Sequence, residues 1–115
     1  MEVPESGLAA GIVVAIKFPF SDLSRAKLRP ALVLADAGKG DFVLCQITSK
    51  SYADTLAVTI ETDDFVTGLL PLTSFARPGK LFTAHGSLIE KALGAIKPEK
   101  HAQVVESVCN LLRNN

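Results

Sequence analysis

The most informative part of the sequence is RPALVLADAGKGDFVLCQIT, residues 29–48. Two apolar runs, 30–35 and 42–48, lie on either side of AGKG (37–40), and small flexible residues of this kind are typical of a hairpin turn. The two runs therefore predict neighbouring antiparallel strands of one β-hairpin.

The register of this hairpin follows if AGKG closes as a symmetric loop between Asp36 and Asp41. Facing residues then lie on the same side of the sheet, with their Cβ atoms about 5 Å apart. The facing pairs include Arg29–Thr48, Ala31–Gln46 and Leu34–Val43. One side of the hairpin is then wholly apolar, and a slip of one residue would bring polar groups onto that side. The apolar side consists of Leu32, Leu34, Val43, Cys45 and Ile47.

The other side of the hairpin collects polar groups at its open end. Arg29, Gln46 and Thr48 meet there, while Val33, Phe42 and Leu44 lie near the turn. Two interpretations are open: a functional pair of Arg29 and Thr48, or an ordinary edge arginine beside an ordinary strand threonine.

Further strands and one helix are predicted outside the hairpin. Apolar patterning predicts strands over 12–18, 56–60 and 80–84. Segment 67–79 contains two prolines and two glycines and is predicted to be mostly irregular with a short extended piece. Segment 87–93 is predicted to be a short turn leading into a strand. These elements indicate a small, mainly antiparallel β-barrel.

The C-terminal segment has the pattern of an amphipathic helix that begins near Pro98. Its apolar residues recur at helical spacing and would pack one face of the helix on the sheet. They are Val104, Val105, Val108, Leu111 and Leu112. The predicted fold is mainly β with a C-terminal helix.

Length, composition and charge restrict the function further. The 115 residues, 48% of them hydrophobic, predict one domain over 1–115, with 1–9 as a flexible N-terminus. Twelve Lys and Arg balance twelve Asp and Glu, so any nucleic-acid site must be a local patch. The longest apolar run, 7–16, is ten residues, whereas a membrane span needs about 20. Glu2 and Glu5 precede that run, unlike a secretory leader, so we expect a cytoplasmic protein.

Most chemistry-bearing residues have a structural interpretation. Cys45 falls on the apolar side of the hairpin and is predicted to be a buried thiol rather than a nucleophile. Neither His85 nor His101 has a second ligand at metal-binding spacing, so no metal site is expected. The basic run Arg25, Lys27 and Arg29 is either a solvated loop or a patch that contacts phosphate.

Several motifs, taken in order, resemble a known family. They are GIVVAIKFPFSDLSRAKLRPALVLA (11–35), QIT (46–48), GLLPLTSFARPGKLFT (68–83) and SLIEKALGAI (87–96), followed by the terminal helix. In this order they resemble the MazF/PemK-like toxins of type II toxin–antitoxin systems. The resemblance covers roughly residues 10–112.

This resemblance implies an SH3-like barrel, usually a homodimer, that cleaves single-stranded RNA without a metal ion or other cofactor and is neutralised by an antitoxin protein. The family's catalytic pair is an arginine before the proline of the second strand and a Thr or Ser at the end of the third. These positions correspond to Arg29 and Thr48. Gln46 and Ser49 are then candidates for orienting RNA.

Two further points follow from the resemblance. Arg25 and Lys27 are candidates for following the RNA backbone through its charge. The first strand of the family usually opens with Gly-Asp, whereas this chain has Ala10 and Gly11. The alternative function is therefore a non-nuclease member of the fold that binds an antitoxin or another protein target.

Overall fold

The computed structural model describes residues 8–18 and 27–114. In this part of the chain, seven strands precede a single α-helix. The strands are β1 (Ile12–Phe18), β2 (Lys27–Gly38), β3 (Asp41–Thr48), β4 (Val58–Ile60), β5 (Phe65–Gly68), β6 (Ser74–His85) and β7 (Ile89–Ile96). The helix is α1 (Pro98–Arg113), and two short 3-10 turns, η2 (Thr62–Asp64) and η3 (Gly86–Leu88), precede β5 and β7.

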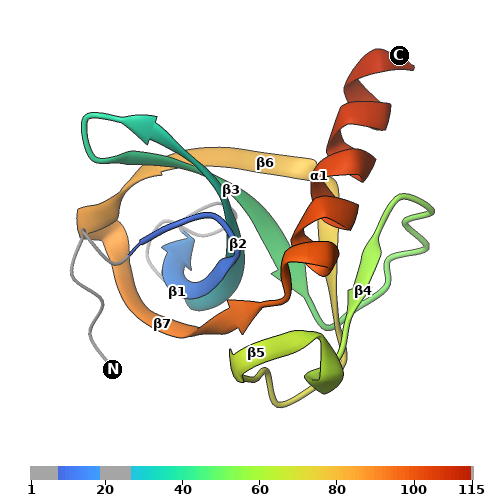
Figure 1. Cartoon of the computed structure of the whole chain (residues 1–115), viewed down its shortest axis with the longest axis horizontal. Helices are drawn as coiled ribbons and strands as arrows, with labels where there is room; N and C mark the ends of the chain where they lie inside the picture. Colours follow the sequence, from blue (N-terminus) through green and yellow to red (C-terminus); the bar gives the residue numbers. More distant parts are fainter. Residues whose placement is uncertain (1–7, 19–26, 115) are drawn as a thin grey trace.

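The strands form one antiparallel sheet in the order β4-β6-β3-β2-β1-β7-β5. The sheet curls strongly around β1 and β2, and α1 lies at one side near β4 and β6 (Figure 1). The predicted fold class, mainly β with a C-terminal helix in a small SH3-like antiparallel barrel, is confirmed. Within the described residues, no helix is both long and apolar enough to span a bilayer.

The β2–β3 hairpin has the predicted register in its central part. Ala31 faces Gln46, and the next two residues of β2 face Cys45 and Leu44. Nearer the turn, Leu34 is an extra residue and Ala35 faces Val43, so the predicted pairing of Leu34 with Val43 is wrong. A bulge of this kind strengthens the local twist, which suits a curled sheet.

The hairpin turn is tighter than predicted. Gly38 already faces Asp41, so the loop consists of Lys39 and Gly40 rather than four residues. The φ angles of Lys39 and Gly40 are +56° and +82°. Two-residue loops with positive φ at both positions match the right-handed twist of the strands.

The extended piece predicted within 67–79 is longer than expected, because β6 begins at Ser74 and continues through the rest of the segment. The β3–β6 ladder is interrupted there: Ala76 faces Ile47, and the next β6 residue to face β3 is Leu81, opposite Cys45. Pro78 lies within this irregular part, where a missing N–H is tolerated. The turn predicted to lead into a strand at 87–93 is confirmed by η3 and β7.

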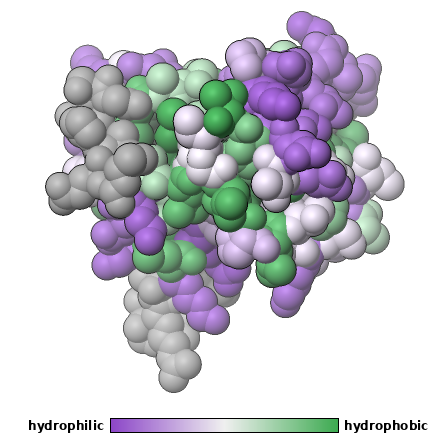
Figure 2. Space-filling view, turned by 60° about the horizontal axis from the view of Figure 1, so that its bottom comes forward, coloured by the Kyte–Doolittle hydropathy of each residue, from purple (hydrophilic) through white to green (hydrophobic). Residues whose placement is uncertain are grey.

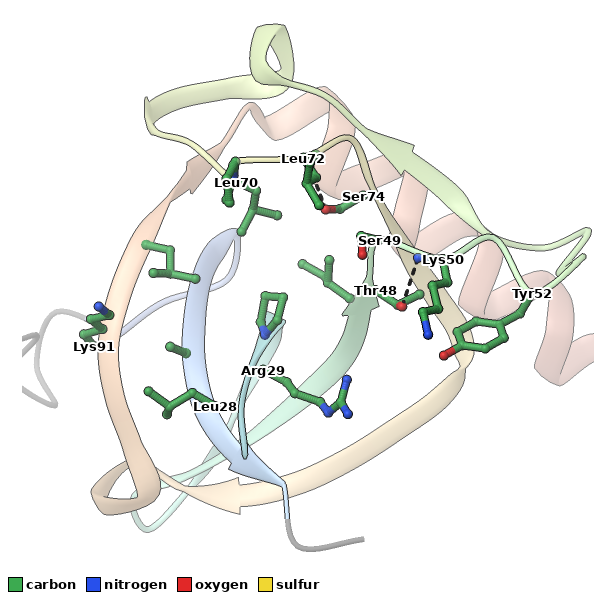
Figure 3. Close-up of a pocket in the computed structure, with 15 residues that line it drawn as sticks. Leu28, Arg29, Thr48, Ser49, Lys50, Tyr52, Leu70, Leu72, Ser74 and Lys91 are labelled. Carbon is green, nitrogen blue, oxygen red and sulfur yellow. Dashed lines mark hydrogen bonds between the residues drawn. The ribbon is translucent and has the colours of Figure 1, made fainter. Parts of the chain in front are cut away.

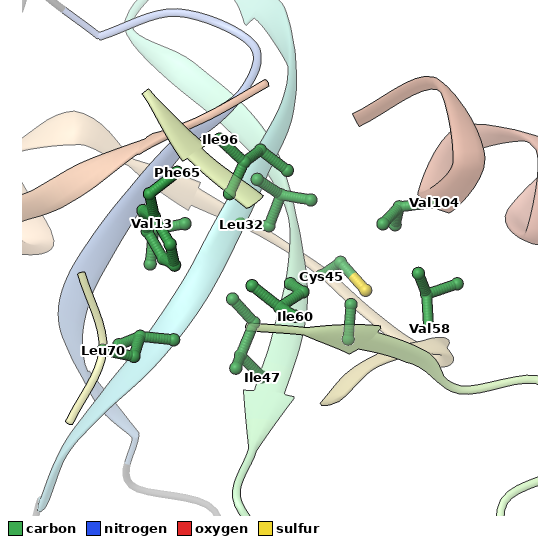
Figure 4. Close-up of a cluster of buried hydrophobic side chains, with 11 residues drawn as sticks. Val13, Leu32, Cys45, Ile47, Val58, Ile60, Phe65, Leu70, Ile96 and Val104 are labelled. Atoms are coloured by element: carbon green, nitrogen blue, oxygen red, sulfur yellow. The ribbon is translucent and has the colours of Figure 1, made fainter. Parts of the chain in front are cut away.

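Both faces of the sheet are buried. Leu32 and Val33 are neighbours on β2, so their side chains point to opposite faces, and both are 0% exposed. The cluster on the side of Leu32 extends to Val104 of α1 (Figure 4). The helix begins with Pro98 as predicted, but Leu112 is 67% exposed. The buried apolar face of α1 therefore ends one turn earlier than predicted, because the last turn of the helix extends beyond the sheet (Figure 1).

Candidate functional site

A pocket of about 460 Å³ lies at the open end of the β2–β3 hairpin, and Arg29, Thr48 and Ser49 are among its lining residues (Figure 3). The β2–β3 ladder begins at Ala31 and Gln46, two residues inside Arg29 and Thr48. The two residues therefore leave the ladder at the same end and line one pocket.

Arg29 comes from the part of β2 that still pairs with β1, where it faces Ile16. Arg29 is exposed, and its guanidinium extends toward the side of the pocket where Lys50 and Tyr52 lie (Figure 3). A guanidinium stays protonated at all physiological pH values and presents a planar fork of donors. Arg29 is thus suited to bind a phosphate or carboxylate through two oxygens.

Thr48 is the last residue of β3 and is 8% exposed. Its position is fixed by β6, where it faces Phe75, and its Oγ1 accepts a hydrogen bond from the backbone N–H of Lys50 at 3.2 Å. A hydroxyl that accepts one bond still has its own proton to donate. The hydroxyl of Thr48 is therefore held in place and available to a ligand.

Two further cations line the pocket, Lys50 and Lys91. Lys50 follows directly after Thr48 and Ser49 in the sequence, so its position near the pocket could have been predicted from the sequence. Lys91 comes from β7 and faces Ala15 of β1. This pairing joins residues far apart in the chain, and no local pattern in the sequence indicates it.

The rest of the pocket is apolar and partly exposed. Leu28 is 52% exposed, Leu72 is 63% exposed and Tyr52 is 57% exposed, and all three line the pocket. Figure 2 shows apolar side chains gathered on one face of the molecule and bordered by hydrophilic ones. The pocket thus combines cationic groups with exposed apolar and aromatic surface.

Two other residues that the sequence indicated, Gln46 and Lys27, do not line this pocket. Gln46 lines a separate, smaller pocket together with Lys80 and Phe82. Lys27 is exposed at the start of β2 and does not line the pocket, and Arg25 lies outside the described residues.

Cys45 is buried, as predicted. Its Sγ donates a hydrogen bond to the carbonyl oxygen of Arg77 at 3.1 Å. Burial raises the pKa of the Cys45 thiol to about 12, so the nucleophilic thiolate does not form near neutral pH. The second cysteine, Cys109, is half-buried in α1.

The two histidines lie in different elements. Nδ1 of His85 accepts a hydrogen bond from the backbone N–H of Ser87 and caps η3. His101, on α1, is half-buried, and this burial lowers its pKa although the ring also bonds the backbone of Leu34. Over 8–18 and 27–114, no group of three or more His, Cys, Asp or Glu residues is arranged to hold a metal ion.

The fold and pocket define a small SH3-like β protein with a cationic and apolar pocket at one end of its sheet. The family model described as "PemK-like, MazF-like toxin of type II toxin-antitoxin system" matches residues 9–112. This match spans most of the chain, and the chain therefore belongs to that family. A search of curated protein sequences gave no significant match.

Solved structures show the same fold at low sequence identity. A mycobacterial endoribonuclease in complex with its cognate antitoxin has a TM-score of 0.74 and 15% identity, covering 94% of this chain and 97% of that one. A MazE–MazF structure from Deinococcus radiodurans has a TM-score of 0.72 and 22% sequence identity, and the match covers 92% of this chain and 96% of that one. The Mycobacterium tuberculosis toxin MazF-mt6 has a TM-score of 0.70 and 13% sequence identity, and the match covers 89% of this chain and 96% of that one.

Proposed function

We propose that this protein is a toxin of a type II toxin–antitoxin system that cleaves single-stranded RNA without a metal ion. The observation that carries the proposal is the shared pocket of Arg29 and Thr48 at the open end of the hairpin. Membership of the PemK-like, MazF-like family supports the activity, and the added charges of Lys50 and Lys91 suit an anionic strand.

In the proposed reaction, the 2′-oxygen of the RNA attacks the adjacent phosphorus, and the bond from phosphorus to the 5′-oxygen breaks. The products are a 2′,3′-cyclic phosphate and a free 5′-hydroxyl. Arg29 binds two phosphate oxygens and stabilises the negative charge that develops on them. The hydroxyl of Thr48 donates a hydrogen bond to the same phosphate and so fixes the orientation of that phosphate.

Neither Arg29 nor Thr48 is a base near neutral pH, so these residues orient the phosphate and stabilise charge. The proton of the 2′-hydroxyl passes to water, which has access because Arg29 and Ser49 are exposed. The 5′-oxygen takes up a proton from water as it leaves. Since the nucleophile belongs to ribose, the proposed reaction requires RNA and leaves DNA intact.

RNA binding extends beyond the reacting phosphate. Ser49 is exposed and lines the pocket, which supports the proposal that its hydroxyl donates a hydrogen bond to the strand. Arg25 and Lys27 remain proposed contacts to the backbone. Gln46 faces a different pocket, so it meets RNA only where the strand continues toward Lys80.

We also propose that one domain spans residues 1–115, that the protein is a cytoplasmic homodimer and that an antitoxin protein neutralises it. The solved mycobacterial relative was determined with its cognate antitoxin. Light scattering should give a mass near twice the 12.2 kDa of one chain. A monomer mass at micromolar concentration would contradict the dimer.

The second candidate function is a non-nuclease member of the fold that binds an antitoxin or another protein target. It is favoured by Ala10 and Gly11, which stand where the family usually has Gly-Asp. The pocket retains both Arg29 and Thr48, which favours the nuclease.

The two functions are separated by incubating the protein with single-stranded RNA of mixed sequence in the presence of a chelator. The nuclease should cut the RNA, and the Arg29→Ala variant, prepared in the same way, should leave it intact. Intact RNA with the native protein, or equal cutting by the variant, would overturn the proposed activity.

A further inference from the structure

Tyr52 is an exposed aromatic residue in an unusual backbone conformation beside the candidate catalytic pair. It lines the pocket with Arg29 and Thr48, and 57% of its surface is exposed. Its φ angle is +52°, and that of Ala53 is +54°. Bulky residues rarely adopt positive φ, and such strain persists only where the surroundings hold it.

A nearly buried ion pair holds this segment. The guanidinium of Arg77, on β6, lies 4.8 Å from the centre of the Tyr52 ring, and its Nε is 3.1 Å from Oδ2 of Asp54. The side chains of Arg77 and Asp54 are only 20% and 16% exposed. Oδ1 of Asp54 also accepts a hydrogen bond from the backbone N–H of Leu56 at 3.0 Å. The ring is therefore fixed from β6 and from its own loop.

The surroundings of the ring match one nucleotide of a single strand. Tyr52 and Lys50 lie side by side on one wall of the pocket, and the exposed Leu28 and Leu72 contribute apolar surface to the same pocket (Figure 3). A nucleotide needs a cation for its phosphate and a flat apolar surface for its base. An aromatic ring supplies such a surface for any of the four bases.

We propose that Tyr52 is a stacking platform for a nucleobase next to the phosphate held by Arg29 and Thr48, and that Asp54 and Arg77 position its ring. The inference rests on the proposed function, because it assumes that the pocket binds single-stranded nucleic acid. Arg77 occupies one face of the ring, and the base stacks on the exposed surface.

The protein itself supplies the optical probe for this contact. The chain contains one tyrosine and no tryptophan, so its tyrosine emission comes from Tyr52 alone. A short single-stranded DNA of mixed sequence lacks the 2′-hydroxyl and stays uncut, while it retains the bases. Titration with this DNA should quench the emission as the strand binds. Unchanged emission at saturation, or no binding of the DNA, would overturn the proposal.

Variants test the contribution of the ring. Tyr52→Phe keeps a stacking surface and should bind the DNA within about twofold of the native protein, whereas Tyr52→Leu should bind about tenfold more weakly. Leu88, 59% exposed and outside the pocket, provides the matched control: Leu88→Ala should bind like the native protein. Equal affinity of Tyr52→Leu and the native protein would overturn the proposal.

An abasic strand with the same sugar–phosphate backbone separates base stacking from backbone contact. The native protein and Tyr52→Leu should bind this strand equally, because it offers nothing to stack. A loss as large as that with normal DNA would assign Tyr52 to the backbone and overturn the proposal.

Parallel cleavage assays with RNA distinguish a failure of this inference from a failure of the proposed function. Quenched emission without RNA cleavage would retain the stacking site and reject the nuclease. RNA cleavage with no effect of Tyr52→Leu on affinity would retain the nuclease and reject the stacking site.

Discussion

The two ends of the β2–β3 hairpin contrast in pairing and in chemistry. At the closed end, the strands pair up to Gly38 and Asp41, and Gly40 accepts a hydrogen bond from the N–H of Gly86 at 2.8 Å. At the open end, pairing stops at Ala31 and Gln46, and the residues beyond it line a pocket. The closed end is paired up to the turn, and the open end leaves side chains available for binding.

The contrast has a physical basis in the sequence of each end. Between the two ends, Val33 and Leu44 are both 0% exposed, so an unpaired polar group there would carry a large desolvation cost. At the open end, Pro30 has no N–H to donate to a ladder, and the β2–β3 ladder begins directly after it. Pro30 thus marks the boundary between the core and the candidate site.

Arg29→Lys should have the largest effect of any change at the open end. It keeps the charge but loses the planar fork, so RNA cleavage should fall by about 100-fold or more while RNA affinity changes little. Gel-based cleavage rates and a binding titration measure the two effects. The control at the closed end is Lys39→Asn, which tolerates positive φ and should cleave like the native protein. Full activity of Arg29→Lys would show that the two ends do not differ in the proposed way.

Thr48→Ala should lower the cleavage rate by about tenfold or more, because one hydrogen bond to the charged phosphate is lost. Thr48→Ser keeps the hydroxyl and should recover most of the rate. Combined with Arg29→Lys, the alanine variant should be little worse than the poorer single variant, since residues that serve one transition state are non-additive. Independent, multiplying losses would mean that the two residues act at different steps.

Gly40→Ala tests the closed end and should affect stability rather than chemistry. Gly40 has a φ of +82°, and a Cβ there would come within 2.5 Å of Nε2 of His85. The free energy of unfolding should fall by roughly 1–2 kcal/mol, measured by denaturant titration. The folded fraction should still cleave RNA at the native rate. An unfolding midpoint equal to that of the native protein would contradict the structural role of the closed end. Slower RNA cleavage by the folded variant would show that the closed end also affects the chemistry.

The smallest expected effect is on the salt dependence of RNA binding. If Arg25, Lys27, Arg29, Lys50 and Lys91 each contact one phosphate, the slope of log affinity against log salt concentration should be near −3.5, from roughly −0.7 per contact. Lys50→Gln should make the slope shallower by about 0.7, and Lys39→Asn should leave it unchanged. The same slope in both variants would remove Lys50 from the interface.

The first strand and the centre of the hairpin could be predicted from the sequence better than the closed end of the hairpin. Alternation over 12–18 matches β1, and the predicted pairing of Ala31 with Gln46 is confirmed. The register shifts between Val33 and Ala35 and between Asp36 and Gly38 were not predicted, because a symmetric loop assumes that neither strand contains an extra residue. Pro78 misled the prediction for β6, since an irregular ladder accommodates it inside a strand.

The candidate site could be predicted in part. Arg29 and Thr48 lie on one hairpin and line one pocket, although the β2–β3 ladder ends before it reaches them. Lys91 and Tyr52 were not predicted, because Lys91 reaches the pocket through the β1–β7 pairing and Tyr52 through its contact with Arg77. Both depend on contacts between distant parts of the chain. Local sequence patterns therefore indicated Arg29 and Thr48 as candidates but not the other residues that line their pocket.

In the proposed reaction, the open end of the hairpin holds an RNA phosphate for attack by the neighbouring 2′-oxygen. A direct test uses a single-stranded RNA that the native protein cuts at one known position, compared with the same strand carrying one deoxyribose immediately before that cut. With chelator present, we expect a 2′,3′-cyclic phosphate end on the RNA product and no cut at the substituted position. Cutting of the substituted strand at the rate of the RNA would contradict the proposed reaction.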